Sequence, residues 1–266
     1  MPYKFVQHSQ DYSDLASGRV FYSLPGHPAF PVRLASEIFQ RCIAARKAIY
    51  HESSPCTLYD PSCGAAYHLS VVAYLHREHI RRIIASDIDE KAVELAKRNL
   101  GLLNLTGLDR RIAEITAMFE EYQKDSHRSA LESAYRIRNA ISTPDQPLAA
   151  NVFQADATDR QALLNNIQPG SVDIVFSDVP YGLHSQWQGF GERSNPMASM
   201  LEAVFDILSP ASILAIASDK QQKAAHEKYR RVEQFQVGKR RVVLLRPVPG
   251  EHSKVVDGPT HSPRRH

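Results

Sequence analysis

The sequence predicts an α/β protein built on a mainly parallel, seven-stranded sheet. Five short apolar segments alternate with helical patterns and end at acidic residues; they span residues 56–60, 82–87, 151–156, 172–178 and 212–219. Two further apolar segments, 232–237 and 240–245, flank Gly238-Lys239, a pattern typical of an antiparallel hairpin. Alternating strands and helices indicate a parallel sheet whose ligands bind beyond the carboxyl ends of the strands, where the acidic residues fall.

Helical patterns account for segments outside this alternation. Apolar residues recur at helical spacing between residues 32 and 49, which predicts a helix leading into the sheet. Segment 105–141 has the same spacing with six acidic and six basic residues, so we expect a solvated helical hairpin packed on the domain. These patterns divide the chain into an N-terminal extension with a helix (1–50), a main domain (51–248) and a tail (249–266), whose low apolar content predicts disorder.

The composition is that of a globular protein, since 43% of the 266 residues are hydrophobic and 23% are charged. No apolar run approaches the ~18 residues that a membrane helix needs, and the first residues lack the apolar centre of a secretory signal. The three cysteines have no CxxC spacing, which argues against a disulfide framework and a zinc site. We expect a cytoplasmic monomer without a metal.

Three aspartates at successive strand ends predict an adenosine-containing cofactor. Asp60 begins the turn that follows the first strand, and Gly64 in that turn lets the backbone approach a ligand closely. Asp87 ends the second strand, where a carboxylate can accept both hydroxyl hydrogens of a ribose. Asp156 ends the third strand and is placed to accept from the exocyclic amine of adenine.

The turn sequence Asp60-Pro61-Ser62-Cys63-Gly64-Ala65-Ala66 favours a cofactor without phosphates. It contains neither G-x-G-x-x-G nor the G-x-x-x-x-G-K-[ST] phosphate loop. S-adenosylmethionine fits, because Asp60 attracts its cationic sulfonium and amino groups. Related turns usually have a glycine where this chain has Ala66, so we expect a weaker but occupied site.

The stretch Asp178-Val179-Pro180-Tyr181 resembles the (D/N)PP(Y/F) motif of class I methyltransferases that modify nitrogen atoms of nucleobases. Such a nitrogen is a poor nucleophile while its lone pair is delocalised or it carries a proton. Asp178 is predicted to accept its N–H hydrogen bond and proton, Pro180 to offer a backbone carbonyl, and Tyr181 a face for stacking. For Trp187, in the loop that follows, two roles are equally compatible with the sequence: stacking on an extruded base, or anchoring the loop in the core.

A basic segment near the C-terminus is a candidate surface for phosphates. Residues 219–246 contain nine Lys or Arg against three Asp or Glu, although the formal net charge of the whole chain is only +3. We expect Lys239, Arg240 and Arg241 to contact the RNA backbone if the substrate is RNA. A solvated surface without a ligand explains the charge equally well.

Four segments, at residues 28–41, 60–64, 84–89 and 178–182, together resemble the AviRa family of avilamycin-resistance methyltransferases, which act on 23S ribosomal RNA. The resemblance implies a Rossmann-like class I methyltransferase domain, S-adenosylmethionine as methyl donor and a guanine in the large-subunit RNA as substrate. By this resemblance the cofactor lies at Asp60, Gly64, Asp87 and Asp156, with Arg33 near its carboxylate, and the target base lies near Asp178, Pro180 and Tyr181.

Methylation of a guanine nitrogen in 23S ribosomal RNA is therefore the leading hypothesis, and the resemblance implies antibiotic resistance as its outcome. A non-catalytic RNA-binding protein that retains a methyltransferase fold is an alternative, with Ala66 as the change that removed the cofactor. Another is a methyltransferase that acts on a different RNA, a small molecule or a protein glutamine. The basic C-terminal segment favours nucleic acid.

Overall fold

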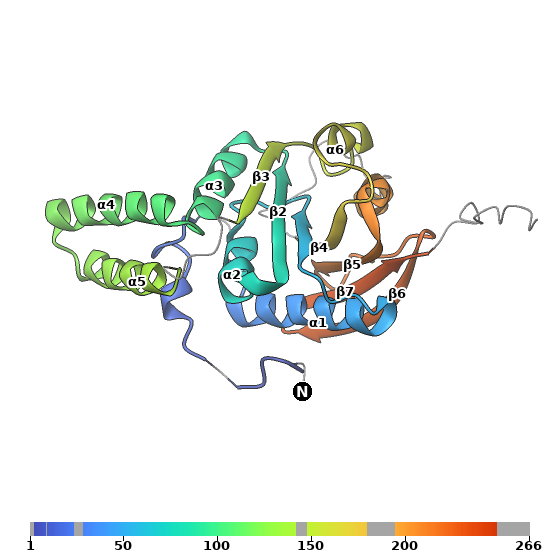
Figure 1. Cartoon of the computed structure of the whole chain (residues 1–266), viewed down its shortest axis with the longest axis horizontal. Helices are drawn as coiled ribbons and strands as arrows, with labels where there is room; N and C mark the ends of the chain where they lie inside the picture. Colours follow the sequence, from blue (N-terminus) through green and yellow to red (C-terminus); the bar gives the residue numbers. More distant parts are fainter. Residues whose placement is uncertain (1–2, 9, 24–28, 142–147, 180–194, 249–266) are drawn as a thin grey trace, which may run out of the picture.

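The computed structural model describes residues 3–8, 10–23, 29–141, 148–179 and 195–248. Within these ranges a seven-stranded sheet has the order β3-β2-β1-β4-β5-β7-β6 (Figure 1). Strands β1 to β5 are parallel, β7 is antiparallel to β5, and β6 is antiparallel to β7. The predicted fold class is confirmed. The strands are β1 (Cys56–Asp60), β2 (Ile80–Asp87), β3 (Ala149–Gln154), β4 (Val172–Asp178), β5 (Leu208–Ser218), β6 (Tyr229–Val237) and β7 (Arg240–Pro247).

Helices cover both faces of the sheet, because alternate strand residues pack on opposite sides. Leu58 and Phe176 pack in the core with α1, α2 and α3. Tyr59 and Val175 pack in the opposite core with α6 and α7. The α-helices are α1 (Val32–Tyr50), α2 (Tyr67–Leu75), α3 (Glu90–Gly101), α4 (Leu105–Tyr122), α5 (Asp125–Ile141), α6 (Arg160–Asn166) and α7 (Pro196–Val204), and the 3-10 helices are η1 (Ser13–Leu15), η2 (Arg77–His79) and η3 (Phe205–Ile207).

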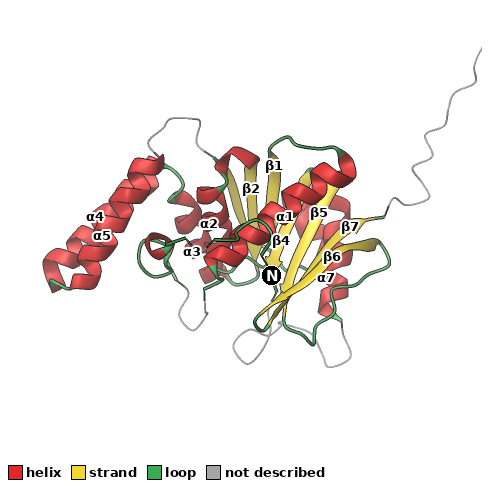
Figure 2. Cartoon of the chain, turned by 90° about the horizontal axis from the view of Figure 1, so that it is seen from below, coloured by secondary structure: helices red, strands yellow, loops and turns green. Residues whose placement is uncertain are grey.

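The pair α4 and α5 forms the helical hairpin predicted for residues 105–141 and extends from one side of the domain (Figures 1 and 2). It has a small core of its own, in which Leu108 and Ile137 pack together with Phe21 from the N-terminal region and Tyr67 from α2. This core attaches the base of the hairpin to the main domain.

Strand β3 ends at Gln154, two residues before the predicted end at Asp156. The reason is local: Asp156 Oδ1 accepts hydrogen bonds from both the backbone N–H and the hydroxyl of Thr158, each at 2.8 Å. An aspartate that bonds to a group two residues along the chain favours a turn over a strand. Asp156 therefore lies in the turn beyond β3.

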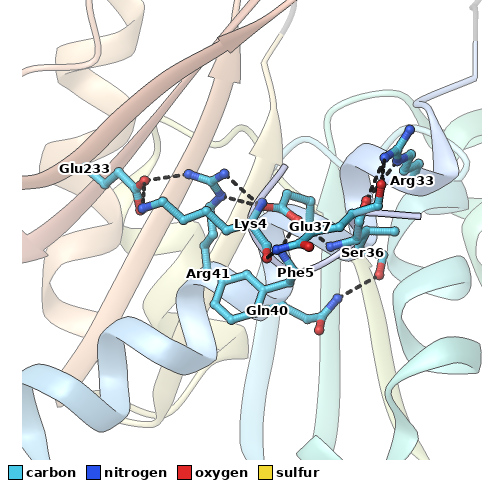
Figure 3. A network of polar contacts seen from close by, with 10 residues as sticks. Lys4, Phe5, Arg33, Ser36, Glu37, Gln40, Arg41 and Glu233 are labelled. Carbon is cyan, nitrogen blue, oxygen red and sulfur yellow. Dashed lines mark hydrogen bonds and ion pairs between the residues drawn. The ribbon is translucent and has the colours of Figure 1, made fainter. Parts of the chain in front are cut away.

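The buried carboxylate of Glu37 in α1 fixes the N-terminal residues to the domain (Figure 3). Burial raises the pKa of Glu37, but the backbone donors and Arg41 together lower it by more, so the pKa is below its ordinary value. Arg41 bonds Glu37 at 2.7 Å and Glu233 on β6 at 2.5 Å. The backbone donors to Glu37 are the N–H groups of Lys4 at 2.6 Å, Phe5 at 2.9 Å and Val6 at 2.9 Å.

The three cysteines are buried and free: Cys42, Cys56 and Cys63. Burial raises the pKa of the Cys56 thiol to about 12, so it stays neutral and packs as a small apolar side chain. None of the helices in the described ranges is both long and apolar enough to cross a membrane. The same ranges contain no group of three or more His, Cys, Asp or Glu side chains that could hold a metal ion.

Candidate active site

Three predicted site residues meet at one edge of the sheet. Asp60, Asp87 and Asp178 are the last residues of β1, β2 and β4, which are neighbours in the order β2-β1-β4. The Asp60 side chain is fully buried, whereas that of Asp178 is 21% exposed. Parallel strands bring their carboxyl ends to the same edge, so strand order alone gathers these carboxylates.

The turn after β1 is held by two of these carboxylates. Asp60 Oδ1 accepts the N–H of Ser62 at 3.0 Å, and Asp87 Oδ2 accepts the N–H of Gly64 at 2.8 Å. Gly64 has a φ of 53°, and a Cβ placed on it would have no atom within 4 Å. The backbone at Gly64 therefore faces open space, which leaves room for a ligand to approach closely.

Ala66 has the left-handed conformation that a glycine would adopt at the same position, with φ 51° and ψ 30°. Ala66 is fully buried and belongs to the core formed with α1, α2 and α3. The methyl group therefore packs away from the open side of the turn. The extra methyl group therefore does not take up space beside Gly64, and the weaker cofactor binding expected from Ala66 stays a prediction.

Asn99 in α3 supports the turn from the side of the N-terminal extension. Its Nδ2 donates to the carbonyl oxygen of Ala65 at 2.8 Å and to that of Tyr22 at 3.0 Å. Its Oδ1 accepts the N–H of Tyr22 at 2.8 Å. One buried amide thus connects the extension, the turn and α3, which restricts the turn to a single shape.

The Oδ1 atom of Asp178 is buried, and no hydrogen-bond donor among the described residues is aligned with it. Arg240 Nε lies 3.7 Å from this oxygen. Burial raises the pKa of Asp178, the positive charges of Arg240 and His68 lower it, and Asp60 raises it, with a net value of about 6. Such a carboxylate is ionised at neutral pH, and its pKa is close to the range that suits a general base.

His68 is a site residue that the sequence reasoning missed. Its Nε2 lies 3.1 Å from Asp60 Oδ2, although no donor is aligned for a hydrogen bond to that oxygen. Its ring contacts Phe30 and Phe176, with centroids 5.6 and 4.7 Å away. Burial lowers the pKa of His68, but Asp60 and Asp178 raise it more. The sequence did contain a signal for this residue, because His68 is a polar side chain within the apolar run of α2, shortly after the turn that Asp60 begins.

Two predicted site residues have different partners from those expected. Arg33 was predicted near the cofactor, but its guanidinium donates to the carbonyl oxygens of Val6, at 2.7 and 3.0 Å, and Gln7, at 2.8 Å. Arg240 was predicted to contact phosphates, but it faces Asp178 and lies over the ring of Phe30. In the structure Arg33 holds the N-terminal segment and Arg240 lies beside Asp178, and their predicted contacts with cofactor and phosphate stay predictions.

The other predicted contacts with RNA remain predictions. Lys239 is exposed at the turn between β6 and β7, and Arg241 is half-buried. Pro180, Tyr181 and Trp187 lie outside the described residues. So does the tail at 249–266.

A family model described as rRNA methyltransferase AviRa matches residues 1–240. The chain belongs to the AviRa family. A 23S rRNA (guanine(2535)-N(1))-methyltransferase from Streptomyces viridochromogenes is 36% identical over 244 residues, which cover 92% of this chain and 95% of that protein. The predicted RNA methyltransferase activity is confirmed at the level of the family.

Two solved structures of the AviRa rRNA methyltransferase from Streptomyces viridochromogenes, at 1.5 and 2.4 Å, are similar to the whole domain. Their TM-scores are 0.81 and 0.80, with sequence identities of 35% and 36%. Each match covers 92% of this chain and 96% of the other. An AviRa methyltransferase needs a methyl donor and an RNA substrate, so the carboxylate edge of the sheet is the candidate active site.

Proposed function

We propose that this AviRa-family protein transfers a methyl group from S-adenosylmethionine to N1 of a guanine in 23S ribosomal RNA. The observation that carries the proposal is the partly exposed Asp178 carboxylate at the end of β4, next to the end of β1 where the turn with Gly64 begins. The relative named for guanine N1 methylation supports the choice of base and atom, because it matches nearly the whole chain. Orthosomycin resistance, as with avilamycin, is the proposed biological consequence.

The residues around the turn fit S-adenosylmethionine. We assign the Asp60 carboxylate, which His68 also approaches, to the amino group of the methionine moiety, and Gly64 leaves room in the same turn. Asp87 uses one lone pair on each oxygen, for Gly64 and Asp89, and retains others for the ribose hydroxyls. Asp156 Oδ1 bonds Thr158, and we assign its carboxylate to the adenine amine.

When bound, S-adenosylmethionine supplies an electrophilic methyl group and leaves as S-adenosylhomocysteine. Guanine N1 carries a proton that must be lost as the new N–C bond forms. The Asp178 carboxylate, whose side chain is partly exposed, accepts the N1–H hydrogen bond and then the proton, which leaves the N1 electron pair for the methyl carbon. The carboxylate therefore acts as a general base and orients the base by the same contact.

The identity of the product tests the proposal. Purified protein is incubated with 23S RNA from a susceptible bacterium and with large subunits, using S-adenosylmethionine that carries a labelled methyl group. Mass spectrometry of the digested nucleosides is expected to show 1-methylguanosine. Label in another nucleoside would contradict the choice of guanine N1, and label in protein alone would contradict the RNA substrate.

The reaction is expected to slow in acid, because Asp178 must be ionised to accept a proton. Its pKa of about 6 predicts that kcat/KM falls through pH 6, by about tenfold per pH unit well below it. Above pH 7 the carboxylate is almost fully ionised, and this group adds no further dependence. Initial rates between pH 5 and 8 with a short RNA substrate measure the profile. A rate that is constant from pH 5 to pH 7 would contradict the assigned role.

Removal of the methyl group at Ala66 is expected to have little effect on cofactor binding, unlike addition of a methyl group at Gly64. Ala66→Gly relieves about 1 kcal/mol of backbone strain but loses about 0.8 kcal/mol of methyl burial and gains unfolded-state entropy. The free energy of unfolding is therefore expected to change by only about 1 kcal/mol, with little change in cofactor affinity.

Gly64→Ala is the matched comparison, since it places the methyl group in the open space beside the turn. It is expected to weaken binding of S-adenosylhomocysteine clearly more than Ala66→Gly does. Urea unfolding and calorimetry on both variants measure the two effects. If Ala66→Gly strengthened cofactor binding by tenfold or more, the alanine would be the weakness that the sequence suggested.

A further inference from the structure

Arg240 is the first residue of β7, and it faces the interior of the site. Val242 and Leu244 follow it at alternate positions and pack in the core with α1, so Arg240 lies on the same face of the sheet. Its guanidinium lies 5.0 Å from the centre of the Phe30 ring, and its side chain is only 20% exposed. A phosphate-binding arginine would instead extend into solvent.

The arginine reaches Asp178 across an intervening strand. In the register, Asp178 of β4 is opposite Ala217 of β5, which is opposite Val242 of β7. Two strand spacings amount to about 10 Å, a distance that only a long side chain crosses. Ala217 packs on the same face as Val242, and its small side chain leaves space above β5.

Among the described residues, the charged groups that act on Asp178 come from three elements. Arg240 extends from β7, His68 from α2 and Asp60 from β1. His68 Nε2 lies 3.1 Å from Asp60 Oδ2, so the histidine pairs with that carboxylate. The cation beside the Oδ1 atom of Asp178 is Arg240, at 3.7 Å.

We propose that Arg240 is a positioning residue for Asp178, which it holds in place and keeps ionised to receive the guanine N1 proton. This inference rests on the proposed role of Asp178. The guanidinium keeps its own protons, because an arginine side chain is not deprotonated in proteins. The N1 proton moves to the Asp178 carboxylate, and Arg240, beside Oδ1, stabilises the ionised carboxylate before that transfer and after its recovery.

The test compares Arg240→Gln, which removes the charge, with Arg240→Lys, which keeps a cation. An opposite charge at this distance lowers the pKa of a carboxylate by about 1–3 units. Arg240→Gln is therefore expected to move the acidic midpoint of the kcat profile up by at least about one pH unit. At pH 7 the single-turnover rate falls several-fold and recovers toward pH 9. Arg240→Lys is expected to restore most of the wild-type midpoint.

Arg241→Gln provides the comparison for phosphate contact, since Arg241 is the next residue of β7. If Arg240 acts on Asp178, its Gln variant changes kcat and the pH midpoint, while the dissociation constant for RNA and its salt dependence stay within about twofold of wild type. Loss of RNA affinity with an unchanged midpoint would overturn the inference and restore a phosphate role. Circular dichroism and thermal unfolding confirm that each variant is folded.

An Asp178→Asn variant separates failure of this inference from failure of the proposed function. If Asp178→Asn is inactive and Arg240→Gln has the wild-type midpoint, Arg240 is not a positioning residue but Asp178 retains its role. If Asp178→Asn is as active as wild type, both the role of Asp178 and the inference built on it are overturned.

Discussion

Asp178→Asn is expected to lower kcat for RNA methylation by about 10²- to 10⁴-fold, the range that a positioned general base contributes. The amide has nearly the same size, and its oxygen can still accept the N1–H hydrogen bond. It cannot take the proton at neutral pH, because an amide has no basic oxygen of comparable strength. RNA and cofactor affinity should change far less than kcat. Single-turnover methylation at saturating RNA measures the chemical step directly.

Asp109→Asn is the matched control for this variant. Asp109 lies on α4, where its half-exposed carboxylate bonds Arg138 of α5 at 2.5 Å. The same chemical change there should leave kcat within about twofold of wild type. If Asp178→Asn kept more than about a third of the wild-type rate, Asp178 would orient the base without accepting its proton, and another group would have to serve as the base.

Asp87→Asn is expected to weaken binding of S-adenosylhomocysteine by about 10- to 100-fold. The carboxylate offers acceptors to both ribose hydroxyls while it holds the Gly64 N–H, and the amide keeps only one oxygen. Hydrogen bonds to a charged group contribute about 1.5–3 kcal/mol, so loss of one accounts for this factor. Titration calorimetry of the purified protein with S-adenosylhomocysteine gives the dissociation constant for each variant.

Asp89→Asn controls for changes to the adjacent helix start. Asp89 caps α3 by accepting the N–H of Lys91, and its side chain is exposed. Asparagine is an equally good N-cap, so stability and cofactor affinity should both stay near wild type. Equal loss of affinity in the two variants would mean that the position of α3, and not the ribose contact, controls binding.

The sequence predicts the sheet and its carboxylate edge well, because both follow from local patterns. Apolar segments end at Asp60, Asp87 and Asp178, and parallel strands bring such ends together. The helical hairpin at 105–141 is equally visible, since its apolar spacing continues through both helices. The end of β3 was predicted wrongly, because a turn formed by Asp156 interrupts an otherwise extended pattern.

The side-chain partners within the site depend on contacts between distant segments, which local patterns do not encode. A count of charge treats Lys239, Arg240 and Arg241 as one basic cluster, but strand alternation sends neighbouring residues to opposite faces. Applied to β7, that alternation would have placed Arg240 with the buried Val242. His68 meets Asp60 only because the turn brings α2 back under β1.

The Glu37 carboxylate makes the first described residues part of the cooperative core. The backbone N–H groups of residues 4 to 6 donate to this fully buried carboxylate. Arg41, which bonds the same carboxylate, also bonds Glu233 on β6. Local opening of this segment would leave the carboxylate without its backbone donors, at a desolvation cost that resists such opening. Hydrogen exchange at these amides should therefore follow the unfolding of α1 and not the fast fraying of an ordinary chain end.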